Sequence, residues 1–120
     1  SLDYPDFLIA SSEWFAFIPA KEYFDEPGDH ADELETSVMM HYHPELVNLD
    51  EAGDGNYKKF ASQMLNEKVA WIPRNWQNVS QDTGIGNPKK ASAGKGKKYA
   101  EAVVAKYALL FEELVHKELY

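Results

Sequence analysis

Apolar residues recur at helical spacing along two segments of the chain. Ala31 opens one stripe, which continues through Leu34, Val38 and Tyr42, and a turn of about 100° per residue brings these side chains to one face. The pattern predicts a helix that begins near Ala31 and ends before Pro44, because a residue that precedes proline avoids helical geometry. A broader stripe predicts a second helix from about Lys95 to the end of the chain; it comprises Tyr99, Val103, Tyr107, Leu110 and Leu114.

Short apolar runs predict a few strands. Residues 7–10 and 14–18 are rich in aromatic and aliphatic side chains and predict two short buried strands or one interrupted strand, and residues 69–72 predict another. Residues 73–94 contain many Asn, Gly, Pro and Ser residues and predict a long irregular connection. So few strands cannot cover the broad apolar face of the last helix. The chain is therefore expected to be part of a larger α/β unit or to oligomerise.

Composition limits the possible chemistry. The chain has 120 residues, 44% of them hydrophobic, which suffices for one compact domain. It has no Cys, which excludes disulfides, thiolate zinc sites and cysteine nucleophiles, so any metal must be held by His, Asp or Glu. No long apolar run predicts a membrane span, and the first residues lack the features of a secretory signal. We therefore expect a soluble, cytoplasmic protein that does not bind a membrane.

Charge is distributed unevenly. Residues 1–54 contain fourteen acidic residues and one Lys, whereas residues 55–120 contain six acidic and eleven basic residues. The two halves are expected to attract each other or complementary partners. A lysine cluster at residues 89–98 raises the possibility of a nucleic-acid site. The net charge of −8, the single arginine and the absence of a binding motif favour a solvated helix entrance instead, so no nucleic-acid partner is predicted.

One carboxylate falls on the apolar side of the first predicted helix. Glu35 falls on the same side of the helical wheel as Ala31 and Val38, whereas Glu33 points to the opposite, solvated side. A carboxylate that faces a core needs an ion pair, a hydrogen bond or a metal. The alternative is an ordinary amphipathic helix, capped near Asp29 or His30, with Glu35 at its edge.

Histidine positions single out one candidate for catalysis. His30 stands at a junction between a loop and a helix, where it could act as a general acid or base or stabilise an oxyanion. His41 and His43 would point about 160° apart on a helix, so they are not expected to share a metal. His116 lies near the end of the last predicted helix, where a cation suits the helix dipole.

Two ordered motifs resemble the creatininase (creatinine amidohydrolase) family. Residues 30–37 read HADELETS and residues 44–47 read PELV, similar to the family's His-Ala-Gly-x-x-Glu-Thr-Ser and Arg-Pro-x-Leu-Val elements. Residues 84–96 resemble its Gly-x-x-Gly-Asp-Pro and Ala-Thr-Ala-Glu-Lys-Gly stretch. This chain departs from the family pattern at Asp32, His43 and Asn87. It also lacks the tryptophan that precedes the histidine in creatininase itself, which argues against creatinine as the substrate.

The resemblance implies a fold and partners. It implies that residues 1–120 form a single partial domain, the C-terminal portion of a three-layer α/β/α creatininase-like domain with few short strands and a long C-terminal helix. Family members hold two Zn²⁺ or Mn²⁺ ions with motifs of their N-terminal half, and those motifs are absent here. The implied partners are the N-terminal half of the same enzyme, a small-molecule amide substrate and further copies in a homo-oligomer, a hexamer by family resemblance.

The resemblance also implies roles for individual residues. His30 would transfer a proton or polarise the scissile amide, Glu35 would join the metal shell, and Gly28 and Asp29 would contact the substrate. The predicted function is the C-terminal part of a metal-dependent amidohydrolase, which cleaves a non-peptide or cyclic amide C–N bond with metal-activated water. This chain alone is expected to be inactive. The alternative is a non-catalytic assembly module that binds a partner through its apolar terminal helix and acidic front half.

Overall fold

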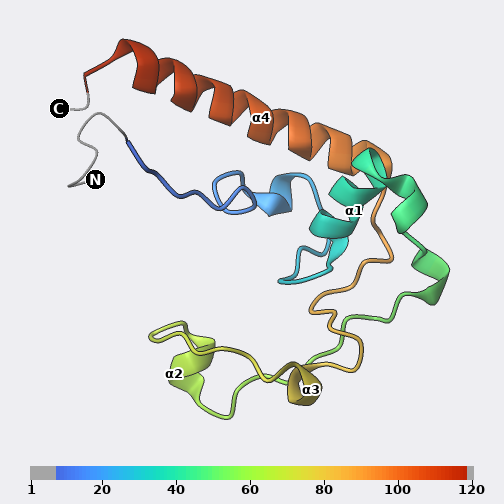
Figure 1. The fold of residues 1–120 in the computed structure, drawn as a ribbon. Coiled ribbons are helices and arrows are strands. Elements are labelled where there is room, and N and C mark those ends of the chain that lie inside the picture. The colour runs from blue at the N-terminus through green and yellow to red at the C-terminus, as the bar shows by residue number, and fades with distance from the viewer. Residues whose placement is uncertain (1–7, 119–120) are drawn as a thin grey trace.

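Two helices organise the molecule. The computed structural model describes residues 8–118, in which α1 (Glu33–Tyr42) lies against the N-terminal part of α4 (Ala93–His116), and the segment before α1 runs beneath α4 (Figure 1). Both predicted helices are thus confirmed. Five short helical turns complete the described secondary structure: η1 (Ala20–Glu22), η2 (Pro44–Leu46), η3 (Leu49–Glu51), α2 (Gln63–Asn66) and α3 (Trp76–Val79).

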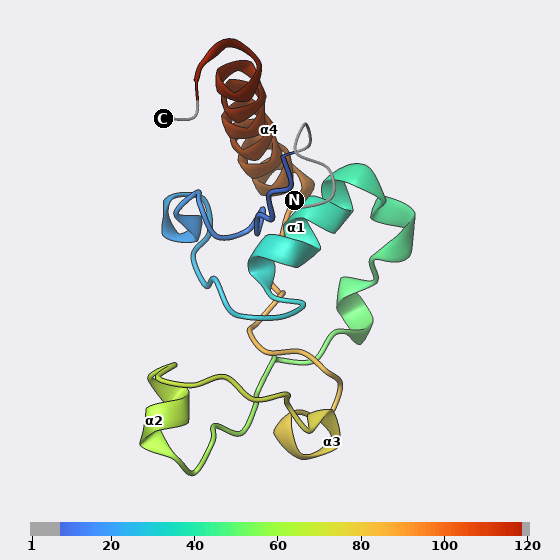
Figure 2. The ribbon, with the colours of Figure 1, turned by 60° about the vertical axis from the view of Figure 1, so that its left-hand side comes forward.

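A small lobe, residues 57–80, lies apart from the two long helices. It carries α2 and α3, and two irregular segments connect it to the rest of the molecule (Figure 2). An isolated antiparallel bridge between Tyr57 and Ser80 joins the two ends of this lobe. The connection predicted at residues 73–94 is irregular, as expected, apart from α3 and the first residues of α4.

The predicted strands are wrong. Residues 8–118 contain isolated bridges but no regular strand, so residues 8–10, 14–18 and 69–72 are turns, bends or irregular backbone; residue 7 lies outside the described part. At residues 14–18 the physical reason is the packing against α4. The Tyr99 hydroxyl lies 3.2 Å from the carbonyl oxygens of both Phe15 and Ile18, so a side chain rather than a neighbouring strand satisfies this backbone.

The helices begin where polar side chains cap them. Asp32 precedes α1 and accepts a hydrogen bond from the Glu35 amide (2.9 Å), so the helix begins two residues later than predicted. Ser92 precedes α4 and accepts from the Lys95 amide (3.3 Å). His116 closes α4, at the end where a cation is favourable.

A glycine allows α1 and α4 to touch. A Cβ atom at Gly96 would lie only 1.9 Å from the Ser37 carbonyl oxygen, so no larger residue fits this crossing. Ser37 is fully buried, and its hydroxyl accepts a hydrogen bond from the Ser92 amide (3.0 Å). The start of α4 is therefore fixed against the middle of α1.

The core is small and lies beside this crossing. Phe24, Leu34, Tyr99 and Val103 form its buried centre, and Tyr99 is completely inaccessible to solvent. Burial raises the pKa of the Tyr99 phenol. Partly buried side chains surround this centre: Trp14, Phe17, Ile18, Ala20, Tyr23, Val38 and Tyr107. The distal half of α4 extends beyond the core, and no described helix is long and apolar enough to cross a membrane.

Candidate functional site

Backbone hydrogen bonds hold the junction that precedes α1. The amides of Asp29 and His30 both donate to the Ile85 carbonyl oxygen (2.8 and 3.0 Å), and the Ile85 amide donates to the His30 carbonyl oxygen (2.8 Å). Ile85 is buried. The two motifs that carry the family resemblance, far apart in sequence, therefore meet at His30.

Close backbone packing shapes the turn beside His30. A Cβ atom at Gly28 would lie 2.6 Å from the Ile85 carbonyl oxygen, and Gly86 has a φ of +122°, which L-residues rarely adopt. The buried Asp32 carboxylate accepts hydrogen bonds from the amides of Gly28 (2.5 Å) and Glu35 (2.9 Å). Asp32 thus caps α1 and closes the turn that presents Asp29 and His30.

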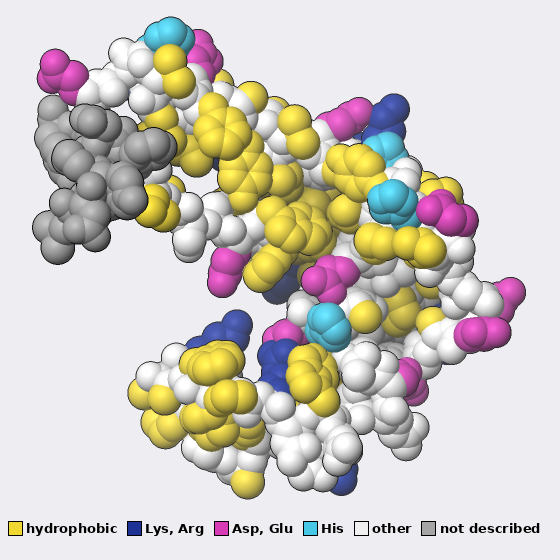
Figure 3. All heavy atoms as spheres, in the orientation of Figure 1, with side chains coloured by type: hydrophobic (Ala, Val, Ile, Leu, Met, Phe, Trp, Pro, Cys, Tyr) yellow, Lys and Arg dark blue, Asp and Glu magenta, His cyan; other side chains and the backbone are white. Residues whose placement is uncertain are grey.

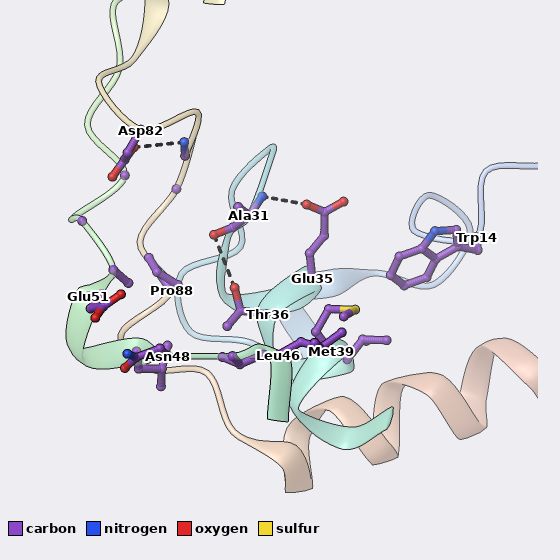
Figure 4. A pocket seen from close by; sticks show the side chains of 18 residues that line it. Trp14, Ala31, Glu35, Thr36, Met39, Leu46, Asn48, Glu51, Asp82 and Pro88 are labelled. Carbon is purple, nitrogen blue, oxygen red and sulfur yellow. Dashed lines mark hydrogen bonds between the residues drawn. The ribbon is translucent and has the colours of Figure 1, made fainter. Parts of the chain in front are cut away.

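His30 and Glu35 form a pair at the start of α1. His30 Nδ1 lies 3.5 Å from Glu35 Oε2, and the two side chains are 45% and 35% exposed. The same Glu35 oxygen accepts a hydrogen bond from the Ala31 amide (2.6 Å; Figure 4). The partners expected for a carboxylate at this position are therefore present, although Glu35 is half-buried at a rim and not enclosed in the core.

Glu33, predicted to face solvent, is completely buried, and that prediction is wrong. Glu33 Oε2 accepts a hydrogen bond from the Glu26 amide (2.6 Å), and Oε1 lies 2.5 Å from Lys95 Nζ. Lys95 also pairs with Asp25 (2.8 Å), which lowers the pKa of Asp25, and the hydrogen bonds to Asp25 and Glu33 raise the pKa of Lys95. The helical wheel missed this contact because Lys95 comes from α4.

Opposite charges join the acidic front of the chain to its basic rear, as predicted. Lys90 pairs with Glu26 (2.8 Å), and this contact raises the pKa of Lys90. Arg74 Nη2 lies 2.6 Å from Asp29 Oδ2, which ties the small lobe to the junction. The lysine cluster at residues 89–98 is thus partly a set of internal ion pairs and only partly a solvated helix entrance.

Trp76 and Arg74 lie beside His30, and the sequence pattern did not predict their place in the site. The rings of Trp76 and His30 lie 5.2 Å apart, and the Arg74 guanidinium carbon lies 5.5 Å from the centre of the Trp76 ring. The single arginine of the sequence was the available signal, since an isolated Arg in an acidic chain commonly pairs with a carboxylate.

Two cavities adjoin Glu35. The larger, of about 540 Å³, is lined by apolar groups such as Trp14 and Met39 and reaches across to Asp82 (Figure 4). The smaller, of about 100 Å³, is lined by Glu35 together with Gly28 and Asp29. A small molecule in the larger cavity would lie beside the Glu35 side chain.

Within residues 8–118, no group of three or more His, Asp or Glu side chains is close enough to hold a metal ion. His30 and Glu35 offer two side chains of the types that bind Zn²⁺ or Mn²⁺, which is too few for a complete site. His43 contacts Glu45 (3.3 Å), and the His41 ring contacts the Tyr42 ring. The described residues therefore do not fit a metal by themselves.

Comparisons with known proteins agree with the two motifs. The family described as Creatininase, creatinine amidohydrolase, matches residues 6–111. The structure is similar to a crystal structure named "Putative creatinine amidohydrolase from Bacteroides fragilis NCTC 9343", with a TM-score of 0.91 and 58% sequence identity over 99% of this chain. The chain spans 47% of that protein, about half its length, and no curated protein matches it. Since the family match covers most of the sequence, the chain belongs to the creatininase family.

Proposed function

We propose that this chain supplies one wall of an amidohydrolase site that cleaves a C–N bond in a non-peptide or cyclic amide. Family membership and the name of the similar crystal structure support the reaction class. The observation that carries the proposal is the His30–Glu35 pair: the Ile85 backbone holds the His30 backbone, and Glu35 lines a cavity of about 540 Å³.

Hydrolysis of an amide adds water to the carbonyl carbon and requires a proton on the leaving nitrogen when the C–N bond breaks. His30 serves as the proton carrier, because an imidazole nitrogen can accept a proton and later donate it. Glu35, with Oε2 3.5 Å from His30 Nδ1, orients the ring. Gly28 and Asp29 are proposed to contact the substrate, because both line the cavity that Glu35 shares.

The metal belongs to the same proposal. A bound Zn²⁺ or Mn²⁺ would supply activated water and polarise the carbonyl. Glu35 is the residue of this chain proposed to join its ligands, and the others would come from outside residues 8–118. The predicted roles of His30, Glu35, Gly28 and Asp29 all stay predictions, and variants of His30 and Glu35 test two of them.

The N-terminal half of the same enzyme is the proposed partner. The accessible surface is 9511 Å², whereas a compact chain of this mass exposes about 6,600 Å². Apolar side chains contribute to the excess: Ile9 is 82% exposed and Val115 is 75% exposed. Such surface is typical of an interface that another segment covers. The predicted homo-oligomer, a hexamer in the family, stays a prediction.

Activity of His30 variants tests the reaction class. In the full-length protein supplied with Zn²⁺ or Mn²⁺, His30→Gln should lower kcat for a panel of linear and cyclic amides by at least about 100-fold. His43→Gln is the matched control, because His43 pairs only with its near neighbour Glu45. An active His30→Gln protein would contradict the role of His30. Activity in the isolated 120-residue chain would contradict the expectation that it is one wall only.

Glu35→Gln separates the two roles proposed for this carboxylate. Loss of bound metal, measured by elemental analysis, supports ligation. Retained metal with a shifted pH profile of kcat supports orientation of His30. The assembly-module alternative predicts that this substitution changes neither metal content nor activity.

A further inference from the structure

A third cavity is lined mostly by the small lobe and includes neither His30 nor Glu35 in its lining. Its volume is about 630 Å³, within the usual range of small-molecule sites. Rings of Tyr57, Phe60 and Trp71 line it, together with four basic side chains: Lys58, Lys59, Lys68 and Arg74. Figure 3 shows basic and hydrophobic side chains side by side on this lobe.

The positive charge of this cavity is not balanced locally. Asp29 is the one carboxylate in its lining, and Arg74 already pairs with it (2.6 Å). Among residues 8–118, Lys58, Lys59 and Lys68 form no ion pair. Since the chain carries a net charge of −8, three unpaired ammonium groups around one hollow form a local site of opposite sign.

Backbone contacts hold the walls of the cavity in place. The Lys58 amide donates to the Val79 carbonyl oxygen (2.8 Å), next to the bridge between Tyr57 and Ser80. The Asn66 side chain accepts a hydrogen bond from the Phe60 amide (3.1 Å) and donates one to the Phe60 carbonyl oxygen (2.8 Å). The basic groups thus project from a defined frame, next to rings that offer flat apolar surface.

The cavity also adjoins the candidate catalytic junction. Ile85 lines the cavity, and its backbone forms hydrogen bonds with the backbone of His30. Arg74 lines it as well, pairs with Asp29 and covers the face of Trp76, whose ring contacts His30. A molecule that extends from the cavity past Arg74 would therefore reach the neighbourhood of His30.

We propose that this cavity is an anion-binding subsite that holds a carboxylate or phosphate group of the amide substrate, with Lys58, Lys59 and Lys68 facing the charge and Trp71 facing the planar part. The identification of the ligand as substrate rests on the proposed function, whereas the presence of an anion site is independent of that function.

Binding of a matched pair of probes tests the site without turnover. Isothermal titration of the full-length protein should give a dissociation constant for benzoate at least about tenfold lower than for benzamide, because only benzoate gains charge-assisted contacts. Inorganic phosphate should compete with benzoate, and added NaCl should weaken benzoate binding.

Variants locate the site. The double variant Lys58→Gln/Lys59→Gln should weaken benzoate binding by about tenfold and leave benzamide unchanged, whereas Trp71→Ala should weaken both. Lys97→Gln/Lys106→Gln on α4, which removes the same charge elsewhere, is the control and should change the affinity for neither probe.

Equal affinities for the two probes, no binding of either, or equal effects of the two lysine double variants would overturn the proposal. Circular dichroism checks that each variant folds, and Lys68→Gln gives an independent second variant with the same expectation as the double variant.

Kinetics connect the site to the substrate. Between 5-oxoproline and 2-pyrrolidinone, two cyclic amides that differ by a carboxylate, Lys58→Gln/Lys59→Gln should raise KM only for 5-oxoproline. Benzoate binding as expected, in a protein that hydrolyses no amide, would leave the anion site standing and contradict the proposed function. Hydrolysis of both amides with unchanged KM values would contradict the substrate assignment of the site.

Discussion

Ala31 has an unusual backbone conformation beside the candidate site. Its φ is +48°, a left-handed value that costs an L-residue roughly 1–2 kcal/mol. Its amide donates to Glu35, so the strain accompanies the geometry of the His30–Glu35 pair. The sequence shows an alanine before an acidic stretch, and nothing in its pattern indicates this conformation.

Ala31→Gly should raise the free energy of unfolding by up to about 1 kcal/mol, because glycine adopts positive φ without steric strain. Chemical denaturation of the full-length protein measures the change. Ala108→Gly in the exposed middle of α4 is the control and should lower stability by about 1 kcal/mol, since glycine is a poor helix former. Destabilisation by Ala31→Gly would show that residue 31 is not strained.

Lys95 should make stability depend on pH in alkaline solution. Its pKa is raised in the folded protein by hydrogen bonds to Asp25 and Glu33, so its contribution is complete below the ordinary lysine value of 10.5 and is lost as pH rises through the folded pKa. Asp25, whose pKa Lys95 lowers, contributes above the ordinary value of 3.8 and loses its contribution as pH falls through the folded pKa.

Comparison of denaturation midpoints across pH checks this expectation. Lys95→Met should be less stable than wild type at neutral pH and should lack the alkaline decline that Lys95 causes. Lys97→Met is the control, because Lys97 makes only an exposed contact of 3.8 Å with Glu101. Burial raises the pKa of Tyr99, so ionisation of Tyr99 also lowers stability at alkaline pH. This effect is common to wild type and both variants, so the difference between their profiles isolates the contribution of Lys95. Identical profiles for both variants would contradict a special role of the pair with Glu33.

At the scale of elements, the helical period of apolar residues predicted the two long helices correctly, whereas the short apolar runs predicted strands that residues 8–118 do not form. The stripe of α4 and the apolar face of α1 predicted both helices because their apolar residues recur at helical spacing, although only part of each stripe is buried: Leu34 in α1, and Tyr99 and Val103 in α4. The apolar run at residues 14–18 looks like a strand, but it packs as a turn against Tyr99 of α4. A short apolar run does not specify which neighbour will satisfy its backbone.

Two glycines of α4 provide a matched test of the helix crossing. Gly96→Ala would bring Cβ to 1.9 Å from the Ser37 carbonyl oxygen and force α1 and α4 apart. Overpacking of this kind lowers stability by about 1–3 kcal/mol or more. Gly94→Ala meets no atom within 4 Å and should instead stabilise the helix by up to about 1 kcal/mol. Equal effects in thermal denaturation would contradict the close approach at Gly96.

The dimensions of the whole molecule exceed those of a compact domain. The radius of gyration is 17.7 Å, whereas about 14 Å is typical of a compact chain of this length. The small lobe and the distal half of α4 account for this, since both extend away from the core (Figures 1 and 2). The predicted single partial domain, completed by another part of the protein, is consistent with this shape and stays a prediction.

Small-angle X-ray scattering of the isolated 120-residue chain should therefore give a radius of gyration well above about 14 Å. Coexpression with the proposed N-terminal half should shield the exposed face of α4 from solvent. Phe111→Asp on that face should weaken association, whereas Glu112→Gln, one position along the same helix, serves as the control. A compact chain, or association insensitive to Phe111→Asp, would contradict the proposed interface.

The sequence by itself determined the two long helices, the attraction between acidic and basic halves, the family motifs and the choice of His30 and Glu35 as candidates. These follow from local periodicity, charge and residue order, which need no knowledge of distant contacts. Only the tertiary structure decided that Glu33 is buried against Lys95, that Ile85 holds His30, and that Arg74, Trp76 and the basic cavity of the small lobe adjoin the junction. Each of these depends on segments that lie far apart along the chain and meet only when α1 packs against α4 and the small lobe contacts the junction before α1.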